Sequence, residues 1–329
     1  NVVYAVIENI NLRDPFSTEI KADSAAGLSP QKREIGGEVY RSDDAGATWR
    51  KTNRMEDNVG GKAAYSFNTL RVDPQDPQKV YVTGLNLQHS YDGGKNWKGI
   101  EWTDTSKIFP EAFGDVRTLY IDPFNPQRML LGSDGGLQLS YDGGKTCDYY
   151  DNIPGGEIYA IGVDMEEPYN IYAGLQDHDS WKGPSNAWSG EITLENWVPV
   201  GGGDGMYNQI DPSNNRWVYN EEQFGNHIRL DQWTGERKNI APRRPGSQKP
   251  YRWNWSPPIR LSPHNPSIVY TGAEVLLRSL DRGDTWQEIS PDLTTNNPQR
   301  INGKGNIQFC TITTISESPR QAGVIWIGT

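Results

Sequence analysis

The stretch Ser90-Tyr91-Asp92-Gly93-Gly94-Lys95-Asn96-Trp97 follows the pattern S-x-D-x-G-x-[T/N]-W, and near-copies of it occur elsewhere in the chain. Residues 42–49 and 279–286 repeat the pattern, and residues 140–147 repeat it with Cys147 in place of Trp. The first three copies begin 48 and 50 residues apart, and the last begins 139 residues after the third, close to three more steps. A period near fifty residues predicts an array or propeller of small sheets.

The motif has the composition of a turn between two strands. Its Asp carboxylate can accept hydrogen bonds from N–H groups of its own turn, and the Gly at the fifth position permits a positive φ. The Trp then opens the next strand and can cover the small core between neighbouring sheets. We therefore predict a structural role for the motif aspartates Asp44, Asp92, Asp142 and Asp281.

Each repeat has the same order of strand signals around this turn. A first strand ends in an Asp-Pro-like corner, as in residues 67–74, and a second strand has the form V-Y-x-x-G, as in residues 80–84. Alternating apolar residues bounded by Gly, Pro, Asn and Asp are typical of strands. A third strand leads into the turn motif and a fourth leaves it, so each repeat is expected to form a four-stranded sheet.

Aligning these signals predicts an all-β fold, a seven-bladed β-propeller of four-stranded antiparallel blades, because such sheets repeated radially make a propeller. Val3-Tyr4 aligns with Val80-Tyr81, so the chain opens on the second strand of a blade and stops after the second strand of the seventh. The first and last blades are therefore predicted to be incomplete. We expect residues 1–329 to be a single propeller segment of a longer polypeptide.

The composition excludes several classes of partner and anchor. A formal net charge of −10 argues against nucleic acid or an anionic membrane as the main partner. No run of eighteen apolar residues exists, so no transmembrane helix is predicted. Cys147 and Cys310 form no metal-binding motif, and their spacing leaves open whether they pair or stay free.

The predicted loops are unevenly distributed between the two faces of the propeller. Connections between first and second strands, and the turn motifs, share one face and are short. Connections between second and third strands and between blades share the other face, and they are long at residues 10–37, 52–65, 99–115, 177–195, 238–257 and 291–308. Long loops on a rigid scaffold are where binding sites are usually built. Contacts to a further part of the polypeptide are the alternative use of such loops.

Acidic and amide side chains follow the second strands on this long-loop face. They are Glu8, Asn86, Asp134, Asp177, Glu222 and Glu274, and Asp204 enters the next blade there. Closely placed carboxylates could supply a general acid and a base, as glycosidases need. They could also bind a cation such as a structural calcium ion. Alternatively, they are there because acidic residues and Asn suit turns.

Aromatic and basic residues accompany the carboxylates on the predicted long-loop face. Arg252, Trp253 and Trp255 lie in one blade-to-blade loop, downstream of Arg243 and Arg244. Aromatic platforms stack on sugars or hold peptide side chains. We therefore predict a ligand site formed by Asp134, Asp177, Asp204, Arg252, Trp253 and Trp255, with Asp177, Asp204, Glu222 and Glu274 as the catalytic candidates if the protein is an enzyme.

The turn motif resembles the Asp-box, or BNR, repeat of sialidases, xyloglucanase-type glycosidases and the sortilin ectodomain. A wider set of segments is similar to a family of large bacterial BNR-repeat proteins labelled "glycosyl hydrolase" or sortilin/VPS10-like. The segments that carry this resemblance are residues 172–177, 201–205, 251–255, 261–266, 281–286 and 315–319. It implies a tandem-propeller protein that is secreted, periplasmic or associated with the cell envelope.

Together these observations predict a non-catalytic scaffold that binds a protein or a polysaccharide, besides the remainder of its own polypeptide. The alternative is a glycoside hydrolase of the xyloglucanase type, with a carboxylate pair on the long-loop face. Carboxylate separations of roughly 5–5.5 Å or 6.5–9.5 Å across an open cleft would favour hydrolysis.

Overall fold

The computed structural model describes residues 2–12, 34–54, 57–60, 66–100, 103–150, 152–153, 155–244, 246, 249–301 and 308–329. The chain divides into two compact units, Asn1–Pro154 and Gly155–Thr329. Each unit is a series of antiparallel sheets whose strands are neighbours in chain order. Within the long loops expected at residues 10–37, 52–65, 99–115, 238–257 and 291–308, the segments 13–33, 55–56, 61–65, 101–102, 245, 247–248 and 302–307 lie outside the described residues. The long loop expected at residues 177–195, between the second and third strands of its sheet, lies instead at residues 185–197, between the third and fourth strands.

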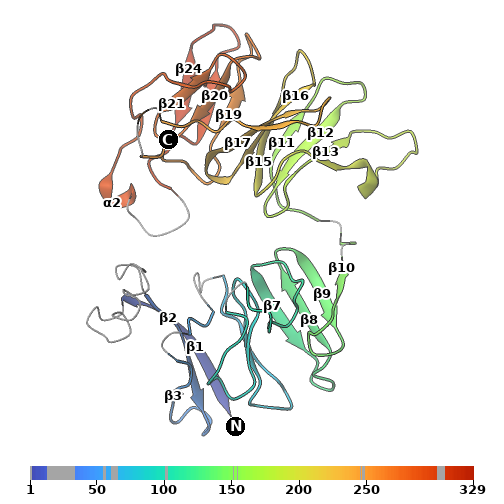
Figure 1. Cartoon of the computed structure of the whole chain (residues 1–329), viewed down its shortest axis with the longest axis vertical. Helices are drawn as coiled ribbons and strands as arrows, with labels where there is room; N and C mark the ends of the chain where they lie inside the picture. Colours follow the sequence, from blue (N-terminus) through green and yellow to red (C-terminus); the bar gives the residue numbers. More distant parts are fainter. Residues whose placement is uncertain are drawn as a thin grey trace. The chain divides into compact units, whose positions relative to one another are not determined.

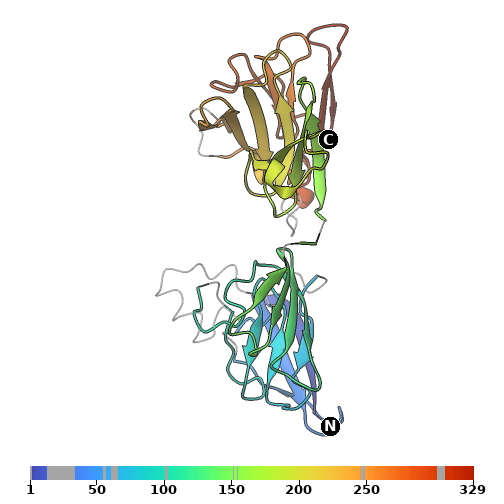
Figure 2. The same cartoon turned by 90° about the vertical axis from the view of Figure 1, so that its right-hand side faces the viewer.

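Among its described residues, the first unit contains three sheets, drawn in blue to green (Figure 1, Figure 2). Their strands are β1 (Val3–Leu12), β2 (Glu34–Ser42) and β3 (Arg50–Lys51); β4 (Leu70–Val72), β5 (Val80–Val82) and β6 (Gln88–Ser90); and β7 (Val116–Ile121), β8 (Met129–Ser133), β9 (Gly136–Ser140) and β10 (Asp148–Tyr150). The first sheet opens on the V-Y-containing strand, as the sequence predicts.

The second unit contains four sheets among its described residues. Three have four strands: β11 (Ile158–Val163), β12 (Asn170–Leu175), β13 (Ser180–Pro184) and β14 (Val198–Pro199); β15 (Gly205–Ile210), β16 (Trp217–Glu222), β17 (Asn226–Asp231) and β18 (Arg237–Asn239); and β19 (Ile259–Leu261), β20 (Val269–Gly272), β21 (Leu276–Ser279) and β22 (Gln287–Glu288). The fourth sheet pairs β23 (Thr314–Glu317) with β24 (Ile325–Gly328), and short helical turns lie at η2 (Leu194–Asn196), η3 (Gln223–Gly225) and α2 (Pro298–Ile301).

In three of the sheets, the Val-Tyr dipeptide of the second strand serves two hydrophobic cores. Neighbouring side chains on a strand point to opposite faces of the sheet. Val218 therefore packs with Tyr172 of the preceding sheet, whereas Tyr219 packs with Ile259 of the following sheet. The pairs Val80-Tyr81 and Val269-Tyr270 divide in the same way. The cores therefore lie between consecutive sheets, which explains how a chain with 35% hydrophobic residues folds.

The four turn motifs share one hydrogen-bond pattern. Each Asp Oδ1 accepts the Ser hydroxyl at 2.7–2.9 Å and the N–H four residues later at 2.8–2.9 Å. Each Oδ2 accepts the Thr or Asn side chain at 2.6–2.7 Å. The Ser oxygen accepts the fifth-position Gly N–H, and that Gly has a φ between 85° and 97°. The carboxylates therefore organise their own turns.

The last motif position packs between sheets in three of the four copies, whereas Trp49 of the first copy is 44% exposed and does not. Trp97 is buried in the core of the first two sheets, and Trp286 packs beside Ile240 and Tyr251. Cys147, which replaces Trp in the third copy, also packs against the core of its sheet. Cys147 and Cys310 are both free thiols.

The second sheet has three strands rather than the predicted four. At the fourth position, Lys98 forms a single bridge to His89, with N···O distances of 2.9 and 3.0 Å in the two directions. Gly99 then adopts a φ of 76°, which turns the chain away from the sheet. A Cβ at Gly99 would come 2.5 Å from the carbonyl oxygen of Leu87.

The all-β, antiparallel prediction is confirmed, and the described strands form seven sheets in the predicted order. This organisation is consistent with a β-propeller. The closed seven-bladed ring and the single-domain assignment stay predictions of the sequence. Among the described residues, no helix is long and apolar enough to cross a membrane.

Candidate functional site

Three of the predicted carboxylates in the second unit lie at loops that bond to one another. The Asp177 N–H donates to Asp204 Oδ1 at 2.9 Å, and the Asp204 N–H donates to Gln223 Oε1 at 2.9 Å. The Asp179 N–H donates to the Gly203 carbonyl at 3.0 Å. These contacts join the β12–β13 turn, the loop before β15 and the end of β16. The structure therefore brings together the loops that carry Asp177, Asp204 and Glu222.

The Gly201-Gly202-Gly203-Asp204-Gly205 segment passes too close to its neighbours for larger residues. A Cβ on Gly202 would lie 3.0 Å from Glu222 Oε1, and one on Gly205 would lie 2.2 Å from the Asp179 carbonyl oxygen. Gly203 also has a φ of 62°, which glycine adopts without strain. The glycines thus bring the Asp204 carboxylate against the adjacent turn.

Glu222 and Glu274 have different electrostatic surroundings. Burial raises the pKa of Glu222 above its ordinary value, the bond from the Gly202 N–H opposes this rise, and Asp179 adds to it. Burial also acts to raise the pKa of Glu274, but bonds from the Arg252 N–H and the Arg244 guanidinium, each 2.7 Å long, outweigh it. Glu274 therefore has a lowered pKa and is ionised at neutral pH.

Of the two predicted tryptophans, Trp255 lies among partly exposed aromatic residues. Its Nε1–H donates to Tyr159 Oη at 3.1 Å, and its ring meets Phe224 edge-on at 5.1 Å. The Phe224 N–H bonds to the Trp255 carbonyl at 3.2 Å. Tyr159 and Phe224 are 37% and 41% exposed. We call Tyr159, Phe224 and Trp255 the aromatic cluster; its residues come from three consecutive sheets or the loops before them.

Trp253 and Arg252 mainly hold their loop in place. The Trp253 ring lies edge-on to His227 at 5.5 Å and to Tyr251 at 5.8 Å. A Cβ on Gly225 would come 2.4 Å from the Trp253 ring. Arg252 donates from Nε to the Cys310 carbonyl at 2.8 Å and pairs with Asp292 at 3.1 Å. The geometry therefore favours Trp255 over Trp253 as a ligand contact.

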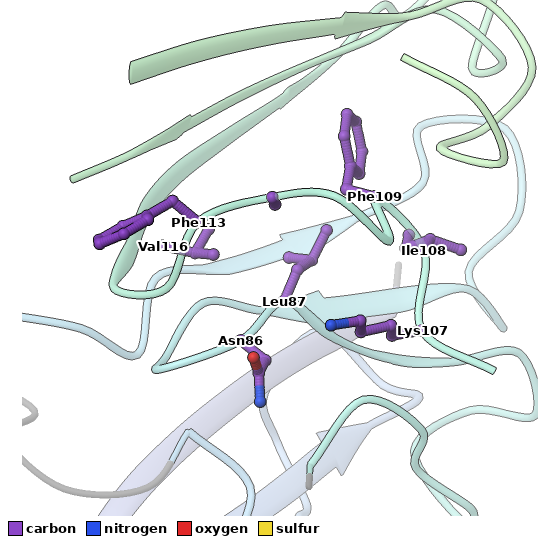
Figure 3. A pocket seen from close by; sticks show the side chains of 8 residues that line it. Asn86, Leu87, Lys107, Ile108, Phe109, Phe113 and Val116 are labelled. Atoms are coloured by element: carbon purple, nitrogen blue, oxygen red, sulfur yellow. The ribbon is translucent and has the colours of Figure 1, made fainter. Parts of the chain in front are cut away.

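Asp134 lies in the first unit and takes part in a separate set of contacts. Its carboxylate accepts hydrogen bonds from both Nε and Nη2 of Arg117, at 2.7 and 2.6 Å. Asn86 lines a pocket there with Leu87, Lys107 and Phe109, and Figure 3 shows these side chains around it. The pocket has a volume of about 10 Å³, roughly enough for one water molecule. It is too small for a sugar or a peptide side chain.

A larger surface groove lies beside Glu274 in the second unit. It has a volume of about 580 Å³ and is lined by Arg244, Tyr251, Trp286, Gln287 and Glu288. Arg244 stacks over the Tyr251 ring at 4.5 Å and bonds to both Glu274 and Glu288. Its size is in the range of small-molecule sites.

Glu221, next to the predicted Glu222, is fully buried. Strand β15 bulges between Gly205 and Asn208, and Glu221 Oε2 accepts the Tyr207 N–H at 3.5 Å within this bulge. Its other oxygen has no hydrogen-bond partner. Burial raises the pKa of Glu221 well above its ordinary value. No sequence pattern singles out this residue, because a bulge shifts the strand alternation only locally.

Tyr159, Phe224 and Gln223 are also absent from the residues that the sequence singles out. The sequence around Tyr159 is that of an ordinary strand. Phe224 is placed in the cluster by a backbone φ of 60°, which a non-glycine residue rarely adopts and which the sequence does not indicate. Within the described ranges, no group of three His, Cys, Asp or Glu side chains is arranged to hold a metal ion. The structural calcium ion stays a prediction.

Comparison with known proteins gives weak similarities, and no protein-family model matches. The sequence is similar to VPS10 proteins over about a third of its length. It is 30% identical over 123 residues to vacuolar protein sorting/targeting protein 10 of Colletotrichum graminicola, covering 34% of this chain and 7% of that protein. It is 25% identical over 111 residues to a probable oligoxyloglucan-reducing end-specific xyloglucanase of Neosartorya fischeri, covering 31% and 13%.

Among solved structures, the GH74 enzyme of Niastella koreensis has 16% identity and a TM-score of 0.30, covering 78% of this chain and 42% of its own. The GH74 xyloglucanase of Xanthomonas campestris has 18% identity and a TM-score of 0.32, covering 79% and 43%. These scores are too low to relate the overall structures. The chain spans only 7% and 13% of the two curated relatives, so the resemblance to both kinds of protein rests on weak sequence similarity.

Proposed function

We propose that the chain belongs to an extracytoplasmic Asp-box β-propeller protein that binds a polysaccharide on the long-loop face of its second unit. The observation that carries the proposal is the aromatic cluster of Tyr159, Phe224 and Trp255, which lies beside the loops of Asp177, Asp204 and Glu222. In this reading the shared turn motifs are the Asp boxes that support the sheets.

The chemistry of the cluster suits a sugar ring. Exposed aromatic faces pack on the apolar C–H faces of pyranoses, while carboxylates and amides accept hydrogen bonds from hydroxyls. Tyr159 already donates its hydroxyl to Gln176 Oε1 at 2.8 Å, so the ring orientation is fixed before a ligand arrives. Preorganised side chains lose less entropy on binding. The weak similarity to a xyloglucanase agrees with a carbohydrate ligand.

Binding without hydrolysis is favoured because the candidate carboxylates have structural partners. Asp204 accepts the Asp177 N–H, Glu222 accepts the Gly202 N–H, and Glu274 accepts Arg244 and the Arg252 N–H. A catalytic acid and base must instead reach the glycosidic oxygen and a water or the anomeric carbon.

The second candidate is a glycoside hydrolase of the xyloglucanase type. One observation favours it: the raised pKa of Glu222 suits a general acid. Asp204 would then be the second carboxylate. This candidate requires turnover, so it is separable from binding by product analysis.

The test is an array of plant and bacterial glycans, including xyloglucan oligosaccharides, together with a peptide array. Trp255→Ala should weaken glycan binding at least ten-fold, because it removes the central ring of the cluster. Trp233→Ala is the matched control, since Trp233 is 71% exposed outside the cluster, and it should leave binding unchanged.

Three outcomes decide between the candidates. Glycan binding without products, lost in Trp255→Ala, supports the proposal. Products that disappear in two of the variants Asp177→Ala, Asp204→Ala, Glu222→Ala and Glu274→Ala would establish the hydrolase instead. Binding confined to peptides, or insensitive to Trp255→Ala, would overturn the carbohydrate site.

A further inference from the structure

The sheet formed by β11 to β14 has a second surface that the proposed glycan site does not use. It lies on the segment between β13 and β14, which loops outward from the sheet (Figure 1), and on the β11–β12 turn. Five large apolar side chains are exposed there by 43% to 105%. They are Met165, Tyr169, Trp188, Ile192 and Leu194. We call this set the insertion patch.

The two segments of the insertion patch are held together by backbone hydrogen bonds. The Ser185 N–H donates to the Tyr169 carbonyl at 2.9 Å. On the β11–β12 turn, buried Asp164 accepts the Asn170 N–H at 2.8 Å and the Asn170 side chain at 2.7 Å. These contacts fix the turn that carries Met165 and Tyr169 beside the base of the insertion.

The insertion is itself ordered by local contacts. The Gly190 N–H bonds to the Ala187 carbonyl at 3.0 Å, and the Thr193 N–H bonds to Asn196 Oδ1 at 2.8 Å at the start of η2. Trp197 then returns the chain to the sheet, because its ring covers Gly183 so closely that a Cβ there would come within 2.5 Å. The exposure of Trp188 and Leu194 is therefore a property of a folded segment.

A patch of this kind indicates an interaction surface. Soluble proteins rarely expose several large apolar side chains together without a binding role. Trp, Tyr and Met are enriched in protein interfaces. Rigid presentation of such anchors lowers the entropy lost on binding.

The charges around the patch define the partner. The exposed carboxylates on the two segments are Glu166, Glu167, Glu191 and Glu195. Between residues 165 and 196 the only Lys or Arg is Lys182, whose ammonium bonds to Gln232 at 3.0 Å and lies over the Tyr172 ring. The patch therefore combines apolar anchors with a rim of negative charge.

We propose that the insertion patch docks a basic polypeptide segment that carries apolar side chains. Lys and Arg of the partner would pair with the glutamate rim, and its apolar residues would cover Trp188 and Leu194. An anionic bilayer or a nucleic acid would be repelled by the rim. A symmetric contact between two copies would place like charges against each other.

The test uses a random 16-residue peptide phage library selected on the wild-type chain and counter-selected on the Trp188→Ala/Leu194→Ala variant. Selected peptides should be enriched in Lys and Arg with interspersed apolar residues. Measured by fluorescence anisotropy, their affinity should fall at least ten-fold in Trp188→Ala/Leu194→Ala. Glu191→Gln/Glu195→Gln should weaken binding less and reduce its salt dependence. Phe124→Ala, which removes a 92% exposed ring of the first unit, is the control and should bind normally.

Intrinsic fluorescence gives an independent readout. Subtracting the emission spectrum of Trp188→Ala from that of wild type isolates the emission of Trp188. The maximum of this difference spectrum should shift to shorter wavelength when peptide binds, because the Trp188 indole is removed from water. Circular dichroism checks that each variant is folded, as expected for exposed positions. Selection of uncharged or acidic peptides, no enrichment, or equal binding to Trp188→Ala/Leu194→Ala would overturn the proposal. Concentration-dependent self-association abolished by Trp188→Ala would instead assign the patch to a second copy.

Discussion

Asp92→Ala tests whether the motif carboxylate is a structural centre. The carboxylate accepts four hydrogen bonds, from the Ser90 hydroxyl, the Lys95 and Asn96 N–H groups and the Asn96 side chain. Lys95 and Asn96 are exposed, so water replaces most of their loss. Ser90 is buried, and its hydroxyl would be left without an acceptor. An unpaired buried donor costs about 1–3 kcal/mol, and we expect this loss of stability.

Urea denaturation followed by tryptophan fluorescence measures this change. Trp97 is a suitable reporter, because it is buried in the same turn and donates from Nε1 to the Gly94 carbonyl at 2.9 Å. A loss of that size corresponds to a fall in Tm of roughly 2–12 °C for a unit of this length. Asp92→Asn keeps one acceptor oxygen and should lose less. Unchanged stability, or lost glycan binding at full stability, would refute a structural role.

Three further predictions concern charge and backbone. The hydrogen bonds from Thr285 lower the pKa of Asp281 to about 2, against a burial effect of opposite sign. The ionised Asp281 therefore stabilises the folded state above pH 3.8, and this contribution should disappear as the pH falls toward 2. In Asp281→Asn, the loss of stability over this pH range should be smaller. Because burial raises the pKa of Glu221, the folded state favours its neutral form, and stability should fall as the pH rises above 4.5. Glu221→Gln should therefore have a higher Tm than wild type at pH 8 but not at pH 4. Gly205→Ala should destabilise the folded state by about 1–3 kcal/mol through overpacking, because its Cβ would meet the Asp179 carbonyl oxygen. The Cβ of Gly235→Ala would meet no atom within 4 Å, so this control should cost only the strain of its positive φ. Equal losses of unfolding free energy for the two variants, measured by urea denaturation, would contradict the packing argument.

The repeat pattern predicts most of the sheet architecture because it depends on local chemistry. A motif such as residues 90–97 contains its own donors and acceptors, so its turn can be inferred without knowledge of distant residues. The Val-Tyr signal likewise reflects strand alternation. The second sheet lacks a fourth strand where Gly99 turns the chain close to the Leu87 backbone. The spacing of the repeats does not reveal this close approach.

The candidate site was less predictable because its geometry comes from loops. The sequence placed Asp177, Asp204 and Glu222 at one end of their sheets, and the structure brings their loops together. It could not show that the Asp204 and Glu222 carboxylates accept hydrogen bonds from backbone N–H groups, since the partners are distant in sequence. Nor could it distinguish Trp253 from Trp255, which differ by the direction in which one loop turns.

The Val-Tyr dipeptide has a consequence for how the molecule unfolds. Because Val218 and Tyr219 belong to different cores, the sheet that carries them contributes to the hydrophobic cores on both of its faces. Unfolding of this sheet would expose both cores, so local opening should spread to both neighbouring sheets rather than stop at one. In nearest-neighbour descriptions of repeat proteins, such coupling between adjacent units makes unfolding cooperative. The tyrosine thereby limits how small an independently melting segment of this chain can be.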